Sequence, residues 1–476
     1  MEFEAVIGLE VHSELSTKTK AFCGCSTEFG KKPNTQVCPI CLGLPGALPK
    51  INKKVVEYGI KAGLAFNCKI NKSTRMDRKN YFYPDAPKNY QITQMYYPLC
   101  ENGYIEIEPV SGKKKKIEIE RIHIEEDAGK LIHTDEGTLI DFNRAGTPLI
   151  EIVSKPDIRT PKEAVLYLTR LKSILQAIGV SDCKMEEGSL RCDANISVRK
   201  KGRCDFGVKC EIKNMNSFKA LEKALEYEYK RQIAIIEKGE NLKQETRRWD
   251  EDNNITAAMR SKEEANDYRY FPEGDLMAIN ISDEWIDKIR ETIPELPHEK
   301  QERFVMEFNI PRYDASILTS SSDLSDFFEE TAMLSGDAKS SSNWIMGDIL
   351  RLINKENISI KDIKFTPAYL AELIKLINEG TISNSAGKIV IEEMFYSGKM
   401  PRAIVKEKGL TQNNDEEEIL KIVRKVLDEN PENIEQYKSG KTKILGYFVG
   451  QVMKNTGGRS NPKIVNKLIL QEINKI

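Results

Sequence analysis

Glu4-Ala-Val-Ile-Gly-Leu-Glu-Val-His-Ser-Glu-Leu15 sets the character of the fold, because apolar and ionisable side chains alternate along it. Successive side chains of a β-strand point to opposite faces of the sheet. One face of this stretch then carries Ala5, Ile7, Leu9 and Val11, and the other carries Val6, Gly8, Glu10, His12 and Glu14. We therefore predict a strand with one face in a hydrophobic core and one ionisable face.

Three further stretches repeat this pattern. Leu190–Arg199 sets Arg191, Asp193, Asn195, Ser197 and Arg199 opposite an apolar face, and Val208–Lys213 sets Lys209, Glu211 and Lys213 opposite Val208, Cys210 and Ile212. In Ile117–Glu126 the apolar phase slips once near Glu120 and Arg121, which predicts a β-bulge, and His123 and Glu125 share the polar side after it. Together these strands predict a sheet whose open face is a floor for a metal–nucleotide site.

The bulk composition excludes several classes of protein. A chain of 476 residues is too long for one core and predicts two to four domains. A net charge of −1 marks neither a nucleic-acid nor a membrane binder. There is no apolar run of transmembrane length and no basic signal-peptide start, and ten cysteines in so long a chain do not indicate a secreted scaffold. We expect a cytoplasmic protein.

The pattern changes from mixed to helical near Pro294-Glu-Leu-Pro297. Before it, helices are expected over Thr160–Gly179, which begins with a capping-box arrangement, and over Ser217–Gly239. After it, apolar spacing predicts helices over Glu299–Phe308, Leu324–Leu334, Ser342–Ile353, Ala368–Asn378, Ser385–Ser397, Glu416–Glu429, Lys441–Asn455 and Pro462–Ile473. The fold class expected is α+β, with a mainly antiparallel domain over 1–292, a helical domain over 293–405 and a helical tail over 406–476.

Two short-spaced thiol pairs, Cys23-x-Cys25 and Cys38-Pro-Ile-Cys41, predict a structural zinc knuckle inserted over residues 23–41. Four thiolates leave no open coordination position, so such a zinc would hold a loop in its folded form and take no part in catalysis. The alternative is a set of ordinary thiols.

Two other segments carry charges of interest. Arg75–Asp85 interleaves basic and aromatic residues and can hold phosphate or stack a base, although a loop packed on the sheet would look the same. From Lys438 onward the chain is basic, which makes Lys441, Lys443, Lys454, Arg459 and Lys463 candidate nucleic-acid contacts. A solvated helical surface is the alternative. Four histidines and no evident Ser-His-Asp or Cys-His arrangement argue against glutamine hydrolysis by this chain.

Several long motifs together resemble one family, the B subunits of the tRNA-dependent aspartyl/glutamyl-tRNA(Asn/Gln) amidotransferases. The resemblance covers the whole chain in order and rests on Gly8–His12, Arg78–Asp85, His123–Lys130, Asp141–Pro148, Met185–Arg191, Glu211–Phe218, Met259–Glu263 with Asp267–Pro272, and Gly446–Lys454 with Asn461-Pro462.

The resemblance implies a fold and a reaction. The first domain would be a cradle similar to the glutamine synthetase/guanidino kinase fold. The chain would use ATP and Mg²⁺ to phosphorylate the side-chain carboxylate of Glu-tRNA(Gln) or Asp-tRNA(Asn). Ammonia released from glutamine by the amidase, or A, subunit would displace the phosphate, in a complex that also contains a small C subunit. The helical and tail domains would hold the tRNA.

Candidate residues follow from these roles. A carboxylate needs a good leaving group before ammonia can displace it, and phosphoryl transfer needs charge neutralisation more than covalent help. We expect Mg²⁺ on Glu10, His12, Glu125 and Glu211, with Asp193 and Glu126 in reserve; His12 can alternatively orient a water or a carboxylate. The expected catalytic residues are Lys79, Glu125, Glu126, Arg191 and Lys213, and the expected nucleotide contacts are Lys79, Tyr81, Asp85, Arg144, Arg191 and Lys213.

Two other functions remain open. A non-catalytic, zinc-containing RNA-binding scaffold would not need a carboxylate-lined face. A small-molecule ATP-dependent amide ligase would leave the helical C-terminal region without a role. Comparing free glutamate with Glu-tRNA as the substrate would separate these functions.

Overall fold

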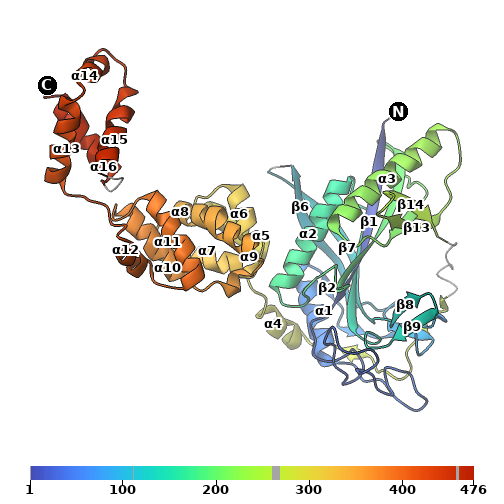
Figure 1. Ribbon diagram of the computed structural model, residues 1–476. Helices are drawn as coiled ribbons and strands as arrows, with labels where there is room; N and C mark the ends of the chain where they lie inside the picture. The colour runs from blue at the N-terminus through green and yellow to red at the C-terminus, as the bar shows by residue number, and fades with distance from the viewer. Residues whose placement is uncertain (1, 111, 260–267, 457–459, 476) are drawn as a thin grey trace. The chain divides into compact units, whose positions relative to one another are not determined.

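The computed structural model describes residues 2–110, 112–259, 268–456 and 460–475. The chain divides into two compact units, Met1–Leu296 and Pro297–Ile476. The first is a mixed α/β unit built on a large sheet, and the second is helical (Figure 1). No helix of the described residues is long and apolar enough to cross a membrane.

The large sheet has nine strands among the described residues, in the order β14-β13-β12-β11-β1-β10-β7-β6-β2. Of the strand pairs described in this sheet, only β12 and β13 run parallel. The strands are β1 (Phe3–Glu14), β2 (Lys69–Ile70), β6 (Cys100–Val110), β7 (Lys113–Glu126), β10 (Pro148–Ser154), β11 (Leu190–Lys200), β12 (Cys210–Lys213), β13 (Glu245–Asp250) and β14 (Ile255–Ala258). This arrangement confirms the expected antiparallel-dominated sheet followed by a helical C-terminal region.

Small sheets and hairpins flank the large one. Their strands are β3 (Ser73–Thr74), β4 (Asp77–Asn80), β5 (Tyr90–Thr93), β8 (Lys130–Thr134), β9 (Gly137–Asp141), β15 (Phe271–Pro272) and β16 (Ile279–Asn280). Pairing of β4 with β5 and β15 places the predicted basic–aromatic segment partly in a three-stranded sheet.

Helices cover the apolar face of the large sheet. They are α1 (Lys53–Ala65), α2 (Pro161–Ala177) and α3 (Phe218–Glu237), with α4 (Asp283–Arg290) later in the unit. The predicted apolar face of β1 lies in one hydrophobic cluster with Leu168 of α2 and Leu221 of α3. Figure 1 shows α2 and α3 lying across this side of the sheet. Burying one face this way leaves the ionisable face to form a site.

The local expectations in this unit were partly right. The predicted bulge is confirmed, because Val153 and Ser154 of β10 pair with Arg121 and Ile119, which leaves Glu120 as the extra residue. Thr160 caps α2 by accepting from the Glu163 amide, and Ser217 caps α3 in the same way.

Three features of the local structure differ from the sequence analysis or are absent from it. The strand expected to begin at Val208 begins at Cys210, and Val208 is exposed. The lysine run Lys113–Lys116 lies in no predicted strand but forms the start of β7, because its partner strand β6 extends that far. Helix α1 was not anticipated, since Gly59 and Gly63 weaken its local preference; both lie against buried side chains of the sheet.

The second unit contains two separate hydrophobic clusters. One runs from Phe304 to Val405 and the other from Ile419 to Ile473. The helices are α5 (Pro297–Glu307), α6 (Arg312–Leu318), α7 (Ser322–Ser335), α8 (Ala338–Trp344), α9 (Leu350–Glu356), α10 (Pro367–Asn378), α11 (Asn384–Ser397), α12 (Pro401–Lys408), α13 (Glu416–Asp428), α14 (Pro431–Lys438), α15 (Ile444–Asn455) and α16 (Pro462–Ile473), with a 3-10 turn at Ile360–Asp362. The helix expected over Ser342–Ile353 is interrupted by a π-turn at Ile345–Ile349, and that expected from Lys441 begins at Ile444.

Candidate functional site

The ionisable face of the large sheet gathers charged residues from adjacent strands into rows. His123 on β7 is paired with Glu151 on β10, Glu151 with His12 on β1, and His12 with Arg191 on β11. Directly opposed residues of antiparallel strands share a face, so these four side chains lie in one row. Glu125 follows His123 on the same side of β7.

Two histidines and two carboxylates meet at the centre of this face. His12 Nε2 lies 3.3 Å from Glu125 Oε1 and 3.3 Å from Glu151 Oε2. His123 Nε2 lies 3.3 Å from Glu151 Oε2 and 3.9 Å from Glu125 Oε2. One ligand atom each from His12, Glu125 and Glu151 falls within 4.8 Å of the others. These three residues are placed to hold one metal ion, and we call them the strand-face cluster.

The electrostatics of the strand-face cluster favour positive charge. Burial by itself lowers the pKa of His12, but the hydrogen bond to Glu151 and the charge of Glu125 outweigh it and raise the pKa to about 9. Burial raises the pKa of Glu151, but the two neighbouring histidines reverse the shift and hold that pKa well below its usual range. The cluster therefore attracts a cation, either as protons on imidazole or as a metal ion.

Two cations border the cluster. Burial lowers the pKa of Lys79, but Tyr270 and Glu125 outweigh it and raise that pKa. The Lys79 ammonium lies 4.8 Å from the centre of the Tyr268 ring and makes no hydrogen bond among the described residues. Arg191 donates from Nη2 to Asp127 Oδ2 at 2.7 Å, while its buried Nε has no partner there. Both groups have donors left for an anionic ligand.

The remaining predicted acids of this face form a second group beside the first. Glu10 is paired with Asp193 across β1 and β11, and accepts a hydrogen bond from Asn195 at 2.7 Å. Lys213 pairs with Asp193 and lies 3.2 Å from Glu211. These contacts neutralise the carboxylates and do not bring them to the strand-face cluster.

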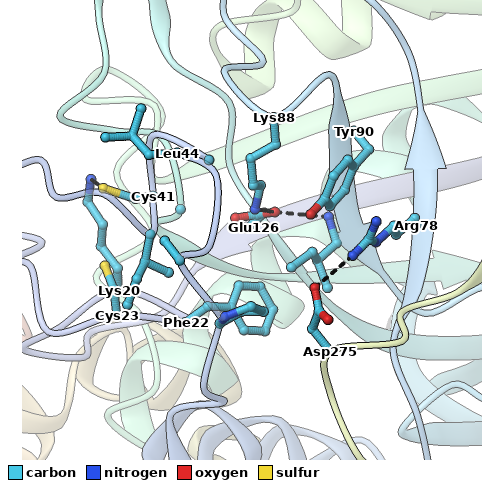
Figure 2. A pocket seen from close by; sticks show the side chains of 16 residues that line it. Lys20, Phe22, Cys23, Cys41, Leu44, Arg78, Lys88, Tyr90, Glu126 and Asp275 are labelled. Carbon is cyan, nitrogen blue, oxygen red and sulfur yellow. Dashed lines mark hydrogen bonds and ion pairs between the residues drawn. The ribbon is translucent and has the colours of Figure 1, made fainter.

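Four predicted residues lie elsewhere. Glu126 pairs with Lys88 and accepts from the Ile92 amide at 2.9 Å. It lines a cavity of about 230 Å³ beside the cysteine loop, with Arg78 and Asp275 across from it (Figure 2). Arg144 donates to the carbonyls of Ala128 and Gly129 and lies 3.4 Å from Asp127. For the other two residues, Tyr81 and Asp85, burial raises the pKa of the side chain.

The four predicted cysteines come together. Their sulfur atoms all lie within 4.8 Å of one another, and Sγ of Cys38 and Cys41 are 3.8 Å apart. The fully buried Lys20 donates to Cys41 Sγ at 3.7 Å, as Figure 2 shows, and Cys41 has a pKa well below its usual range, first because of its hydrogen bond with Cys23. A cluster of thiols with one sulfur poised as a thiolate can bind a metal ion.

The predicted tail contacts are exposed. Lys441 and Lys443 precede α15, Lys454 lies in its last turn and Lys463 lies in the first turn of α16. None of the four has an ion pair within the described part of the chain. Arg459 and the motif residues 260–263 and 267 lie outside the described residues.

The sequence interpretation missed Glu151 and Asp127. Glu151 is the one charged side chain in the otherwise apolar strand β10, Pro148–Ser154. A charge in a buried strand is costly unless it is paired, so this isolation was a usable signal. Asp127 directly follows β7, and only its contacts with Arg191 and Arg144 in the folded chain identify it as part of the site.

Comparison with known proteins relates the whole chain to one family. A family model described as "GatB/GatE catalytic domain" matches residues 5–287, and one described as "GatB domain" matches residues 326–473. Curated proteins named as the B subunit of aspartyl/glutamyl-tRNA(Asn/Gln) amidotransferase are similar to the chain: 69% identical over 476 residues in Clostridium tetani and 70% over 474 residues in Clostridium novyi, with 100% of each chain covered.

Proposed function

Since this chain belongs to the family of aspartyl/glutamyl-tRNA(Asn/Gln) amidotransferase B subunits, we propose that its strand-face cluster is where the side-chain carboxylate of a misacylated tRNA is activated. Members of the family take part in tRNA-dependent amidation as glutamine-dependent ligases. The substrates proposed are Glu-tRNA(Gln) and Asp-tRNA(Asn). The observation that carries the proposal is the convergence of His12, Glu125 and Glu151.

The donor atoms of the strand-face cluster fit a divalent cation. Two carboxylates supply the oxygen ligands that Mg²⁺ prefers, and one imidazole adds a nitrogen that Mg²⁺ tolerates less well. We propose Glu125 and Glu151 as its main ligands, with His12 as the third. When bound, ATP with Mg²⁺ supplies the phosphoryl group that converts the substrate carboxylate into a displaceable group.

The protein's own part is to orient and neutralise. Lys79 and Arg191 place donors at the edge of a carboxylate-rich face, where a phosphate would otherwise be repelled. Asp127 keeps the Arg191 guanidinium in one orientation through the 2.7 Å hydrogen bond. Lys213, held by Asp193 and Glu211, is the next cation along this face. Phosphoryl transfer requires this combination of metal-binding carboxylates with cations that neutralise the phosphate.

The proposal includes partners and a fold relationship. We propose that the first unit is a cradle related to the glutamine synthetase/guanidino kinase fold. An amidase (the A subunit) would supply ammonia, and a small protein (the C subunit) would complete the complex. The three-part division at residues 292 and 405 is part of this proposal, and the separate hydrophobic clusters of the second unit support its last boundary.

The deciding experiment uses the chain purified in complex with its A and C partners. ATP hydrolysis and amide formation are followed on Glu-tRNA(Gln) with glutamine as donor, and free glutamate replaces the charged tRNA in a control. Turnover with charged tRNA only supports the proposal. Tight tRNA binding without tRNA-stimulated ATP use would favour the scaffold function, and turnover of free glutamate would favour the small-molecule ligase.

We also propose that the four cysteines hold a structural zinc ion. A zinc ion about 2.3 Å from each thiolate sets neighbouring sulfurs about 3.8 Å apart, and Cys38 and Cys41 match this spacing. Lys20 offsets part of the negative charge of four thiolates. Replacing Cys38 and Cys41 with Ser should remove about one equivalent of zinc by elemental analysis and lower the thermal midpoint by several degrees. The exposed Cys204→Ser is the matched control, and unchanged zinc content would refute the site.

The exposed tail lysines should bind tRNA phosphates. Replacing Lys441, Lys443, Lys454 and Lys463 with Ala should weaken tRNA binding and flatten its salt dependence by roughly 0.7–0.9 in the logarithmic slope for each lysine–phosphate interaction removed. A matched variant replaces the ion-paired or hydrogen-bonded Lys361, Lys364, Lys399 and Lys408 with Ala. Equal salt slopes for both variants and the wild type would make the tail charge incidental.

A further inference from the structure

A second polar cavity lies beside the strand-face cluster, near the end of β1. It has a volume of about 170 Å³ and is lined by carboxylates and hydroxyl groups, among them Glu14, Thr147, Asp182 and Glu187. No lysine or arginine lines it in the described part of the chain, but Lys184 pairs with Asp182 and Glu187, which leaves Glu14 as its carboxylate without an ion pair there. A cavity of this chemistry offers acceptors to a positively charged, hydrogen-bond-donating group.

Two side chains of this cavity lack partners. The Glu14 carboxylate makes no hydrogen bond or ion pair among the described residues, and the Thr147 hydroxyl makes none although this side chain is only 5% exposed. Buried polar groups of a folded chain are normally hydrogen-bonded. Neither Arg191 nor Arg144 donates a hydrogen bond to Glu14 or Thr147; the two arginines pair with Asp127 and with main-chain carbonyls. Both side chains line the cavity, and Thr147 is otherwise buried, so a group that enters the cavity can pair with their oxygens.

The strand register fixes the distance from this cavity to the strand-face cluster. Glu14 is two residues from His12 on the same face of β1, which is roughly 7 Å along a strand. Leu149 pairs with both Glu14 and Glu125, so Glu14 lies in the same row as Glu125 with one strand between them. In a glutamyl group, four bonds of about 1.5 Å separate the reacting carboxyl carbon from the α-nitrogen, on the order of 5 Å when extended. One aminoacyl group can therefore reach both places.

We propose that this cavity binds the α-ammonium group of the aminoacyl ester, with Glu14 and Thr147 as its acceptors. The inference rests on the proposed function and deepens it, because it assigns the subsite that holds the amino acid while its side-chain carboxylate lies at the strand-face cluster. Glu14 is then a substrate-positioning residue. The subsite selects an esterified amino acid with a free α-amino group over an ester that lacks one.

The test compares two substrates with three forms of the complete complex. The substrates are Glu-tRNA(Gln) and its hydroxy-acid analogue, in which a hydroxyl group replaces the α-amino group. The forms are wild type, Glu14→Gln and Glu4→Gln, the last being the same change on the same strand and face, at a residue paired with Arg199. We expect wild type and Glu4→Gln to favour the amino substrate roughly ten- to a hundredfold in kcat/KM. Glu14→Gln should lose most of this preference by turning over the amino substrate more slowly.

If Glu14→Gln does not fold, Thr147→Val provides an independent form, because it replaces only the hydroxyl with a methyl group. It should reduce the preference for the amino substrate by a smaller factor than Glu14→Gln. An equal loss by Glu14→Gln on both substrates would overturn the inference. So would an unchanged preference, or a shift in the Mg²⁺ concentration for half-maximal ATP use in place of a changed preference. Amidation of Glu-tRNA(Gln) by wild type separates these outcomes from failure of the proposed function, because absence of that activity overturns both.

Discussion

Glu151→Gln and Glu125→Gln should each slow ATP-dependent amidation about a hundred- to a thousandfold while changing tRNA affinity no more than a few-fold. Each replacement keeps the shape of the side chain and removes one of the two negative charges of the strand-face cluster. Removing a group that stabilises developing charge in a water-poor site costs this much in other enzymes. Both residues are largely buried, so solvent cannot supply the missing charge.

Single-turnover amidation of Glu-tRNA(Gln), with tRNA affinity measured in parallel, checks the expectation. Glu118→Gln is the matched control, because Glu118 lies on the same strand as Glu125 but is exposed and paired with Lys155. Excess Mg²⁺ should rescue the two cluster variants partly if the lost carboxylates are ligands. Near-wild-type turnover by Glu151→Gln would remove it from the site and leave the cluster without its central residue.

Glu228→Leu should destabilise the first unit by about 3–5 kcal/mol, the range for breaking a buried ion pair from one side. Glu228 is fully buried on α3 and accepts from Arg231 at 2.7 and 2.9 Å, from Gln232 at 2.9 Å and from Thr256 at 3.0 Å. Arg247 of β13 lies 3.6 Å away. The variant leaves two half-buried guanidinium groups with fewer acceptors, and their partial desolvation makes that costly.

This loss should reach the site through β13. Thr246 on that strand donates to Glu211 at 2.9 Å, so loosening of β13 removes a hydrogen bond from the acids beside the strand-face cluster. Amide hydrogen exchange should show lost protection in α3, β13 and β14. The exposed Glu226→Leu on the same helix is the control, and adding Arg231→Leu to Glu228→Leu should recover part of the stability. A change below about 1 kcal/mol would show that the network is incidental to stability.

The alternation of apolar and ionisable residues correctly predicted a sheet with one face in the core and one ionisable face. The period of two in Glu4–Leu15 and Leu190–Arg199 reflects burial of one face, so the sequence states directly which side chains meet the core. The slip near Glu120 was likewise readable, because an extra residue in a strand reverses the alternation after it. The cysteine spacing was readable for a different reason, since four thiols on two short loops need little tertiary context to meet.

Which acidic residues form the site was harder to predict. Glu10, Glu125, Asp193 and Glu211 look equivalent in sequence, because each is an acid on the polar side of a strand. Their neighbours across the sheet separate them. Glu125 meets His12, whereas Asp193 and Glu211 meet Lys213 and Glu10 meets Asn195. Glu126, one residue from Glu125, points to Lys88 because neighbouring side chains of a strand face opposite ways.

Local spacing and the cost of exposing apolar surface were enough to predict which strand faces are buried, where most helices lie and that four thiols would cluster. Strand order and register needed the folded chain, and with them the meeting of His12, His123, Glu125 and Glu151. The reason is that His12 meets the other three residues only through pairing of β1 with β10, a strand more than a hundred residues later in the chain. A shift of one residue in any of these strands would turn its acids toward the core and remove them from the site.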